Sequence, residues 1–415
     1  MSELVKHYQN TMQGIPQLTN NWGAMIALLD AVLVTGFNHV PILGLSKSSA
    51  SSITATINLG SGHGFINRQV VRIAGSTNGW DGDYKVLSAD STSITVECTA
   101  AHASTILGTA TCFTAPADFE IVHQTPVSSI EPKRAYRSTD PESLGLILLV
   151  HDFCSVGAAA AGAKFAKVGL VESMTDIDTI VGNQLPGNSN NWGWNGTHHG
   201  CAKWYYATPA QANNYDTRND TVAPSNGNRS FTIVADDISI AVLIRDSFMA
   251  GLYGIFEFFD TETQGLNVML AAAGAAVNIS QSQVVFPPVR GAIGVGVGTA
   301  AEYGGGGGVL QKGILWYSGS ALREDTLLSR PLILCHPTNN IGTTQIASTV
   351  ANNIYMQTPI IDSSNKFRGV MPFVRLQVGA GLNGMFVTED GLVSAISVNN
   401  GNFGSNIFAL SLELQ

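Results

Sequence analysis

The segment from residue 1 to 45 carries one strongly apolar stripe. Its five largest members are spaced as on one side of a helix: Trp22, Met25, Ile26, Leu29 and Leu33. Asn20 or Asn21 precedes the stripe as a candidate helix cap, and Gly36 follows it as a candidate stop. Further apolar residues up to Val34 widen the stripe, so the pattern predicts a helix that is buried nearly all round. This helix packs either under the rest of the chain or against another subunit, and its five large residues are interface candidates.

The pattern changes from residue 46 to 114, where short segments alternate apolar and polar residues with a period of two. Five such segments, bounded by Gly, Asn, Asp or Ser, lie at 52–58, 70–74, 84–87, 93–98 and 106–113. Asn78-Gly79 and Asp81-Gly82 supply residues for tight turns. We therefore expect a small five-stranded β-domain that is inserted into the surrounding chain.

From residue 115 to 415 the chain contains apolar runs of strand length and little helical periodicity. Strands are predicted at 135–138, 144–152, 166–172, 231–235, 238–245, 254–259, 313–317, 331–335, 373–378 and 408–414. The expected fold is mainly β: a β-sandwich or β-barrel body with the small inserted five-stranded β-domain and one buried N-terminal helix. Two long loops are also expected, one rich in Asn, Gly and Trp at about 182–227 and one rich in Gly at about 291–308.

Composition bears on assembly. Charged residues make up only 12% of the chain, about half of the typical ~25%, and Gly reaches 44. Because charge normally keeps soluble monomers apart, an uncharged polar surface favours a homo-oligomer, for which we assume a trimer. The alternative is a monomer kept soluble by Asn, Ser and Thr.

Charge and segment length exclude several classes of partner. The net charge is -9, and the 21 Lys and Arg residues form no run longer than Lys133-Arg134, so no nucleic-acid partner is expected. The first residues lack the features of a signal peptide. The apolar stretches 24–34 and 268–277 are shorter than the ~20 residues of a membrane helix, so no membrane insertion is expected. Five widely spaced cysteines indicate reduced, buried thiols made in a cytoplasm.

A zinc site can be considered at two short segments. His151 with Cys154, and His198 and His199 with Cys201, offer suitable ligands if the segments meet in space. A strand would send His151 and Cys154 to opposite faces, so the spacing fits poorly. Buried thiols and loop histidines are the simpler interpretation, and no metal is predicted.

Cofactor and catalytic motifs are also weak. The Gly-rich stretch lacks the Lys-Ser/Thr and the helix of a phosphate-binding loop, so no cofactor is predicted. Glycoside hydrolysis needs two carboxylates at a fixed distance. Three acidic pairs come into question: Asp236-Asp237, Asp260 with Glu262, and Glu389-Asp390. Adjacent strand residues point to opposite faces, so only Asp260 and Glu262 could share one. No Gly-x-Ser-x-Gly motif is present, and no catalytic residue is predicted.

Aromatic residues gather in and beside the Asn-, Gly- and Trp-rich stretch. They are Trp192, Trp194, Trp204, Tyr205 and Tyr206. Such side chains can form a protein interface, stack on sugar rings or anchor a loop to its domain. The three alternatives stay open, and Trp192, Trp194, Trp204 and Tyr205 join the helix residues as interface candidates.

Four blocks carry a resemblance to a known family: residues 7–36, Gly62-His-Gly-Phe65, residues 134–140 and residues 168–179. In wording and order they resemble a family of virion structural proteins encoded with the tail genes of tailed phages. The likeness extends to about residue 180, and beyond it only 231–236 is similar. The resemblance implies a place in the particle, at the tail tip or baseplate, and implies no enzymatic activity.

The sequence thus predicts a non-enzymatic structural component of a tailed-phage virion, assembled in the host cytoplasm. It would act through homo-oligomeric assembly and docking to other tail or capsid proteins. The main alternative is a receptor-binding adhesin or polysaccharide depolymerase on the same tail, with a host surface glycan as partner. A capsid decoration protein and a bacterial surface protein are further alternatives.

Overall fold

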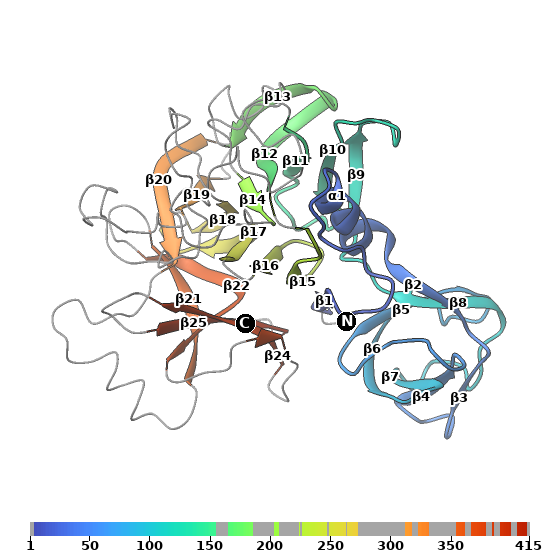
Figure 1. The fold of residues 1–415 in the computed structure, drawn as a ribbon. Helices are drawn as coiled ribbons and strands as arrows, with labels where there is room; N and C mark the ends of the chain where they lie inside the picture. The colour runs from blue at the N-terminus through green and yellow to red at the C-terminus, as the bar shows by residue number, and fades with distance from the viewer. Residues whose placement is uncertain are drawn as a thin grey trace.

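In a computed structural model of the chain, the structure describes residues 4–154, 165–185, 203–206, 224, 226–246, 249–262, 264–272, 312–317, 323–331, 354–361, 367–378, 384–385, 391–399 and 405–412. Within these residues the fold is mainly β, with antiparallel sheets of twelve, six and seven strands and one short helical region (Figure 1). The expected fold class is confirmed. No helix among the described residues has the length and apolarity needed to cross a membrane.

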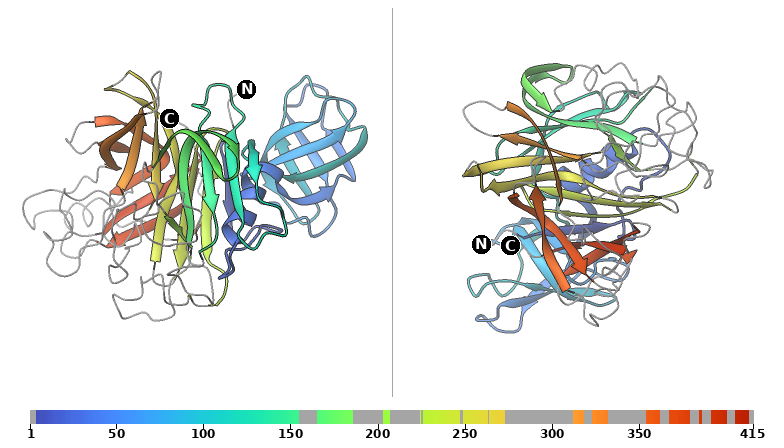
Figure 2. Two further views of the ribbon diagram at one scale, coloured as in Figure 1. Left: turned by 90° about the horizontal axis from the view of Figure 1, so that it is seen from above. Right: turned by 90° about the vertical axis from the view of Figure 1, so that its left-hand side faces the viewer.

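The seven-stranded sheet forms a small barrel beside the body (Figure 2). Its strands are β2 (Phe37–Pro41), β3 (Gly44–Lys47), β4 (Thr54–Asn58), β5 (Val70–Ser76), β6 (Gly82–Ala89), β7 (Ser93–Glu97) and β8 (Gly108–Thr114), in the order β2-β8-β5-β6-β7-β4-β3. The two edge strands, β2 and β3, follow each other in the chain. Between them the nitrogen of Ile42 donates to the carbonyl of Ala110 in β8, and the nitrogen of Leu43 donates to the carbonyl of Asn58 in β4. One bent segment therefore closes the sheet on itself.

The barrel contains two more strands than the sequence pattern predicts. The five expected strands are present as β4 to β8, and β2 and β3 begin the sheet at Phe37, ahead of the predicted boundary at residue 46. β2 ends at a proline and was too short to show a clear alternation. Its pairing partner β8 lies far along the chain, with Phe37 opposite Thr114, so local pattern alone could not identify it.

The N-terminal helix consists of α1 (Ala24–Leu29) and a π-helical continuation, η1 (Asp30–Thr35). Met25, Ile26, Leu29 and Leu33 are each at most 3% exposed and lie in the core formed with the body strands. The helix thus packs under its own chain, which decides between the two arrangements that the sequence left open. Trp22 precedes the helix and packs against this core.

The cap of this helix comes from a distant strand. Gly23 occupies the N-cap position with φ 89°, and no side chain from the preceding residues bonds the first turn. The carboxylate of Asp152 instead accepts a hydrogen bond from the nitrogen of Met25 at 2.8 Å. The cap expected from Asn20 or Asn21 is therefore wrong, because Asp152, just after a body strand, satisfies the exposed nitrogen.

The body contains the other two sheets. The six-stranded sheet is formed by β9 (Phe119–Gln124), β10 (Lys133–Ser138), β11 (Ile147–His151), β12 (Phe165–Asp176), β13 (Thr179–Leu185) and β14 (Lys203–Tyr205). The twelve-stranded sheet runs in the order β1 (Lys6–Gln9), β15 (Ser230–Ala235), β16 (Ile240–Asp246), β17 (Met249–Asp260), β18 (Gly265–Ala272), β19 (Lys312–Tyr317), β20 (Arg323–Pro331), β21 (Ile354–Ile361), β22 (Phe367–Val378), β25 (Ser405–Ser411), β24 (Leu392–Asn399) and β23 (Gly384–Met385).

Strands β15 to β18 form the middle layer of the body. One face of this layer packs against the six-stranded sheet and the helix, with residues such as Ile233 and Val242 in that core. The opposite face packs against β22, β24 and β25, with Phe256 and Phe373 in a second core. The body is therefore a β-sandwich in which both faces of the middle strands are buried.

The predicted loops are described only in part. The stretch at 291–308 lies outside the described residues. Within 182–227 the described parts include the end of β13 and the strand β14, so this stretch is not entirely loop. Strand β20 ends at Pro331, where the sequence pattern placed the start of a strand.

Candidate functional site: the ion-pair ring between barrel and body

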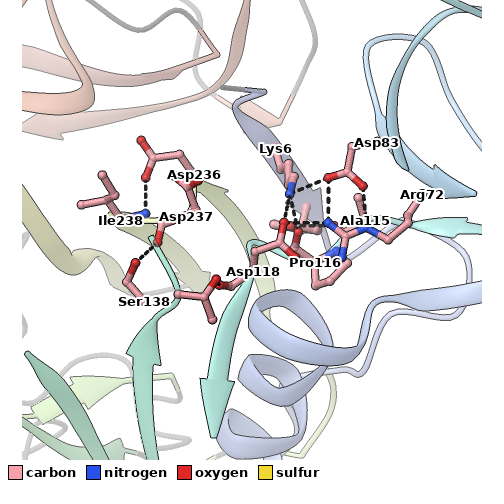
Figure 3. Close-up of polar contacts among 12 residues, drawn as sticks. Lys6, Arg72, Asp83, Ala115, Pro116, Asp118, Ser138, Asp236, Asp237 and Ile238 are labelled. Carbon is pink, nitrogen blue, oxygen red and sulfur yellow. Dashed lines mark hydrogen bonds and ion pairs between the residues drawn. The ribbon is translucent and has the colours of Figure 1, made fainter. Parts of the chain in front are cut away.

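The barrel meets the body where β1 passes the connection from β8 to β9 (Figure 3). Lys6 comes from β1, which pairs with β15 at the edge of the body sheet. Arg72 on β5 and Asp83 on β6 come from the barrel, and Asp118 comes from the connecting segment. Four charged side chains from three parts of the chain thus converge at one point.

These four side chains form a closed ring of alternating charge. The Nζ atom of Lys6 lies 2.8 Å from Asp83 Oδ2 and 2.9 Å from Asp118 Oδ2. The Nη2 atom of Arg72 lies 2.9 Å from Asp83 Oδ2 and 2.6 Å from Asp118 Oδ2. Each cation therefore bridges both carboxylates. Lys6 also donates to the carbonyl of Pro116 at 2.6 Å, so the ring holds the connecting backbone as well.

Burial strengthens these interactions. The Lys6 side chain is 6% exposed and the Asp118 side chain 35%. Burial alone raises the pKa of Asp118, but the hydrogen bond from Arg72 and the charge of Lys6 outweigh it and hold that pKa below its usual value. Hydrogen bonding to Asp83 raises the pKa of Arg72. Asp118 and Arg72 therefore stay charged at neutral pH.

Neighbouring hydrogen bonds fix the connecting segment on both sides of the ring. The hydroxyl of Tyr8 donates to the carbonyl of Ala115 at 2.8 Å. The hydroxyl of Thr139 donates to the carbonyl of Asp118 at 2.6 Å. Figure 3 also shows Ser138, whose hydroxyl donates to the carbonyl of Asp237 at the turn after β15. The junction is thus a rigid attachment, and its chemistry is that of a structural clamp.

The predicted interface residues lie elsewhere. The helix residues Met25, Ile26, Leu29 and Leu33 are covered by their own chain, and Trp22 packs edge-on against Phe153 and Phe165, with ring centroids 5.8 and 5.9 Å apart. The structure therefore does not present them as a surface.

The aromatic group is described only in part. Trp204 is fully buried, and its indole nitrogen donates to the carbonyl of Ala271 at 2.9 Å. Tyr205 is 5% exposed and packs edge-on against Phe165. Both side chains anchor β14 to the body, so neither is available for a partner or a sugar. Trp192 and Trp194 lie outside the described residues.

Basic side chains form a row across the six-stranded sheet. Lys133 lies opposite His151, His151 opposite Lys167, and Lys167 opposite Lys203. Lys133 pairs with Asp178 at 2.6 Å. Burial lowers the pKa of His151 to about 2, and the charges of Lys167 and Lys133 add to this effect, so His151 is neutral. His198, His199 and Cys201 lie outside the described residues, and within the described part no three potential ligands gather for a metal ion.

The acidic pairs have structural partners. Asp260 is fully buried and forms an ion pair with the equally buried Arg368 at 2.5 Å, while Glu262 lies exposed in the following turn. Asp236 accepts hydrogen bonds from Ile238 and Ser239 and closes the turn after β15. Glu389 and Asp390 lie outside the described residues.

Sequence reasoning missed the four residues of the ring. Lys6, Arg72, Asp83 and Asp118 are isolated charges in four separate segments, and no spacing between them repeats. Arg72 and Asp83 lie opposite each other in the β5–β6 hairpin, and β1 brings Lys6 to them only through its pairing with β15. The alternation of the two predicted strands was the available signal for the Arg72–Asp83 pair, and no local signal identifies Lys6 or Asp118.

Comparisons with known proteins add little. No family model matches the chain, and no curated protein matches it. Among solved structures the chain is similar to a protein described as "Phage phi92 endosialidase", at 12% identity, over 90% of this chain and 70% of that chain, with a TM-score of 0.17. A TM-score this low establishes no shared fold and carries no argument about function.

Proposed function

We propose that this chain is a non-enzymatic structural subunit of a tailed-phage virion, at the tail tip or baseplate. It acts through homo-oligomeric assembly, for which we propose a trimer, and through docking to neighbouring virion proteins. The observation that carries the proposal is the ring of Lys6, Arg72, Asp83 and Asp118, which holds a separate barrel in one orientation on the body.

A barrel held in a fixed orientation suits a protein that acts by presenting a binding surface to its neighbours. The barrel has its own core and stands beside the body, so it adds surface to the molecule (Figure 2). Three of its large apolar side chains are more than half exposed: Leu43 at 68%, Ile53 at 64% and Leu107 at 59%. Exposed apolar residues on a surface with little charge favour association with other proteins.

The strongly buried acids support the same proposal. Asp152 caps the N-terminal helix, and Asp260 pairs with Arg368. Both groups are engaged in holding the fold, whereas a catalytic carboxylate needs access to a substrate. The sequence resemblance to tail-associated virion proteins supports the location.

Two experiments test the proposal. Light scattering coupled to size-exclusion chromatography of the full chain is expected to show a stable oligomer, and immunogold labelling of virions is expected to place the chain on the tail. A strict monomer at high concentration, or labelling of the head alone, would contradict it. Incubation with capsular polysaccharide is expected to release no oligosaccharide, and release would favour a depolymerase instead.

A further inference from the structure

Two large apolar side chains are exposed side by side at one end of the middle layer. Phe259 on β17 lies directly opposite Leu266 on β18, so the two share a face of the hairpin. Phe259 is 56% exposed and Leu266 is 41% exposed. The same face carries Ile255 and Val268 further along, and these are buried in the main core. Phe259 and Leu266 therefore extend the apolar face of the hairpin beyond the part that is buried in the main core.

The part of this face that is covered by the rest of the chain ends at Glu257. Ser143 and Leu144, in the connection from β10 to β11, both donate hydrogen bonds to the carboxylate of Glu257, at 2.9 Å from the Ser143 hydroxyl. Leu144 packs against the main core at this point. Because Phe259 lies two residues beyond Glu257 on the same strand face, it is the first side chain past this connection.

Acidic residues adjoin the exposed pair along the strand, in the turn and in the neighbouring connection. Glu257 precedes Phe259, Glu262 follows in the turn, and Glu142 adjoins the hydrogen-bonded Ser143. Glu142 and Glu262 are exposed. Arg368, whose carbonyl accepts a hydrogen bond from the nitrogen of Thr261 in the turn, is fully buried and forms an ion pair with Asp260. We call the group of Phe259, Leu266, Glu142, Glu257 and Glu262 the acidic apolar face.

Glu257 itself is half-buried on this face. Burial raises its pKa, hydrogen bonds from Leu144 and Ser143 oppose this in part, and the charges of Asp236 and Asp140 add a smaller increase, so that the pKa is about 7. The exposed acidic side chains that a partner would meet are therefore those of Glu142 and Glu262.

We propose that the acidic apolar face docks a partner protein that presents apolar side chains flanked by Lys or Arg. Apolar residues of the partner cover Phe259 and Leu266, and its basic residues face Glu142 and Glu262. A second copy in a symmetric contact is disfavoured, because its own carboxylates would meet these carboxylates. The inference stands on these residues alone and holds whether or not the chain belongs to a virion.

The test uses the full chain and a fluorescent peptide of alternating leucine and lysine as the probe. Fluorescence anisotropy is expected to show binding that weakens as salt rises, because salt screens the charged part of the contact. Two matched peptides, leucine with glutamate and serine with lysine, are expected to bind at least about tenfold more weakly. Equal binding of all three peptides would overturn the proposal.

Variants then locate the binding. Phe259→Ser with Leu266→Ser, and separately Glu142→Gln with Glu262→Gln, are each expected to weaken probe binding about tenfold. The control pair is Val127→Ser with Ile130→Ser, which removes two apolar side chains that are 91% and 81% exposed elsewhere on the body.

Melting curves check that each variant is folded. The Gln pair keeps the apolar residues, so it tests the charged part even if the Ser pair unfolds. Loss of binding in the control pair, or unchanged binding in the Gln pair, would overturn the proposal. A dimer of the wild type that the Phe259 and Leu266 substitutions abolish would show that a second copy is the partner, and would also overturn it.

Discussion

The carboxylate of Asp152 lies 2.8 Å from the backbone nitrogen of Met25, although 127 positions separate the two residues in the chain. Its second oxygen accepts the hydroxyl of Tyr206 at 2.7 Å. Burial raises the pKa of Asp152 to about 7, against a partial lowering by these hydrogen bonds. The folded state therefore prefers the protonated form, so the contribution of Asp152 to stability is full below pH 4 and is lost as pH rises through 7.

Replacing Asp152 separates its charge from its hydrogen bonds. Asp152→Asn keeps an acceptor and cannot ionise, so unfolding free energy is expected to fall less between pH 5 and pH 8 than in the wild type. Asp152→Ala leaves the Met25 nitrogen and the Tyr206 hydroxyl unpaired and is expected to cost about 2–3 kcal/mol at pH 5 and less at pH 8, because the wild type itself loses stability between these values. Urea unfolding at the two pH values measures both effects. An Asn variant with the wild-type pH dependence would refute the assignment.

His7 is expected to contribute to the acid side of the stability profile together with His151, whose pKa is also lowered by burial. Burial, followed by the charge of Arg68, lowers the pKa of His7 to about 4, and neither ring nitrogen has a hydrogen-bond partner among the described residues. Because this pKa is below the usual 6.5, stability present above pH 6.5 is lost as pH falls toward 4, by about 3 kcal/mol.

His7→Leu is expected to reduce this loss, with the share of His151 remaining, and to leave stability at pH 7 unchanged or higher, because it removes an unpaired buried polar group. Chemical unfolding at pH 7 and pH 5 is the measurement. The matched control is His39→Gln at an exposed histidine, which is expected to leave the acid profile unchanged. An equal change in both variants would mean that His7 is not the responsible group.

The ion-pair ring is expected to show strong coupling. Lys6→Met or Arg72→Met alone leaves two carboxylates sharing one cation, and each is expected to destabilise the barrel–body junction by about 1–3 kcal/mol, reduced from the value for fully buried pairs because Arg72 and Asp118 are partly exposed. A double-mutant cycle is expected to be non-additive. The readout is the rate of limited proteolysis in the segment between β8 and β9, and unchanged cleavage would argue against a clamp.

The buried pair of Asp260 and Arg368 offers a different outcome. Both side chains are fully buried, so Arg368→Met alone leaves an unpaired charge and is expected to cost about 3–5 kcal/mol. The double variant Asp260→Leu with Arg368→Met removes both charges and is expected to be less destabilised than the single one. Thermal unfolding compares them, and a double variant that is less stable than Arg368→Met would contradict the expectation.

Excision of the barrel has well-defined ends. Phe37 lies opposite Thr114, so residues 36 and 115 can be joined by a short linker once 37–114 is removed. The remaining body is expected to be soluble and to unfold cooperatively. Excision of 46–114 would leave β2 without its partner strand β8, and this variant is expected to aggregate. Equal solubility of the two variants would show that β2 does not belong to the barrel.

Local pattern predicted the parts of the fold that local physics determines. The alternation in 52–58 and 93–98 marks β4 and β7 because one face of each strand is buried in the barrel. The helical spacing up to Leu33 marks a real helix for the same reason. β2 shows little alternation, and its partner strand β8 lies far along the chain.

The candidate functional residues were harder to predict because the residues that they contact in the fold lie far away in the sequence. Trp204 and Leu29 have the residue types of an interface, yet both fill the core. Phe259 and Leu266 have the same types and stay exposed. Residue type thus indicates the capacity to bury area, and only the tertiary arrangement decides whether the chain itself or a partner provides the cover.

Closure of the barrel by the bent segment from Phe37 to Lys47 has a mechanical consequence. A sheet with a free edge can be peeled open one ladder at a time under tension. Here the first half of the segment pairs with β8 and the second half with β4. A force on either end of the segment must therefore break the backbone hydrogen bonds to both strands together. Under tension such a module is expected to resist unfolding up to a higher force and then to unfold in one step.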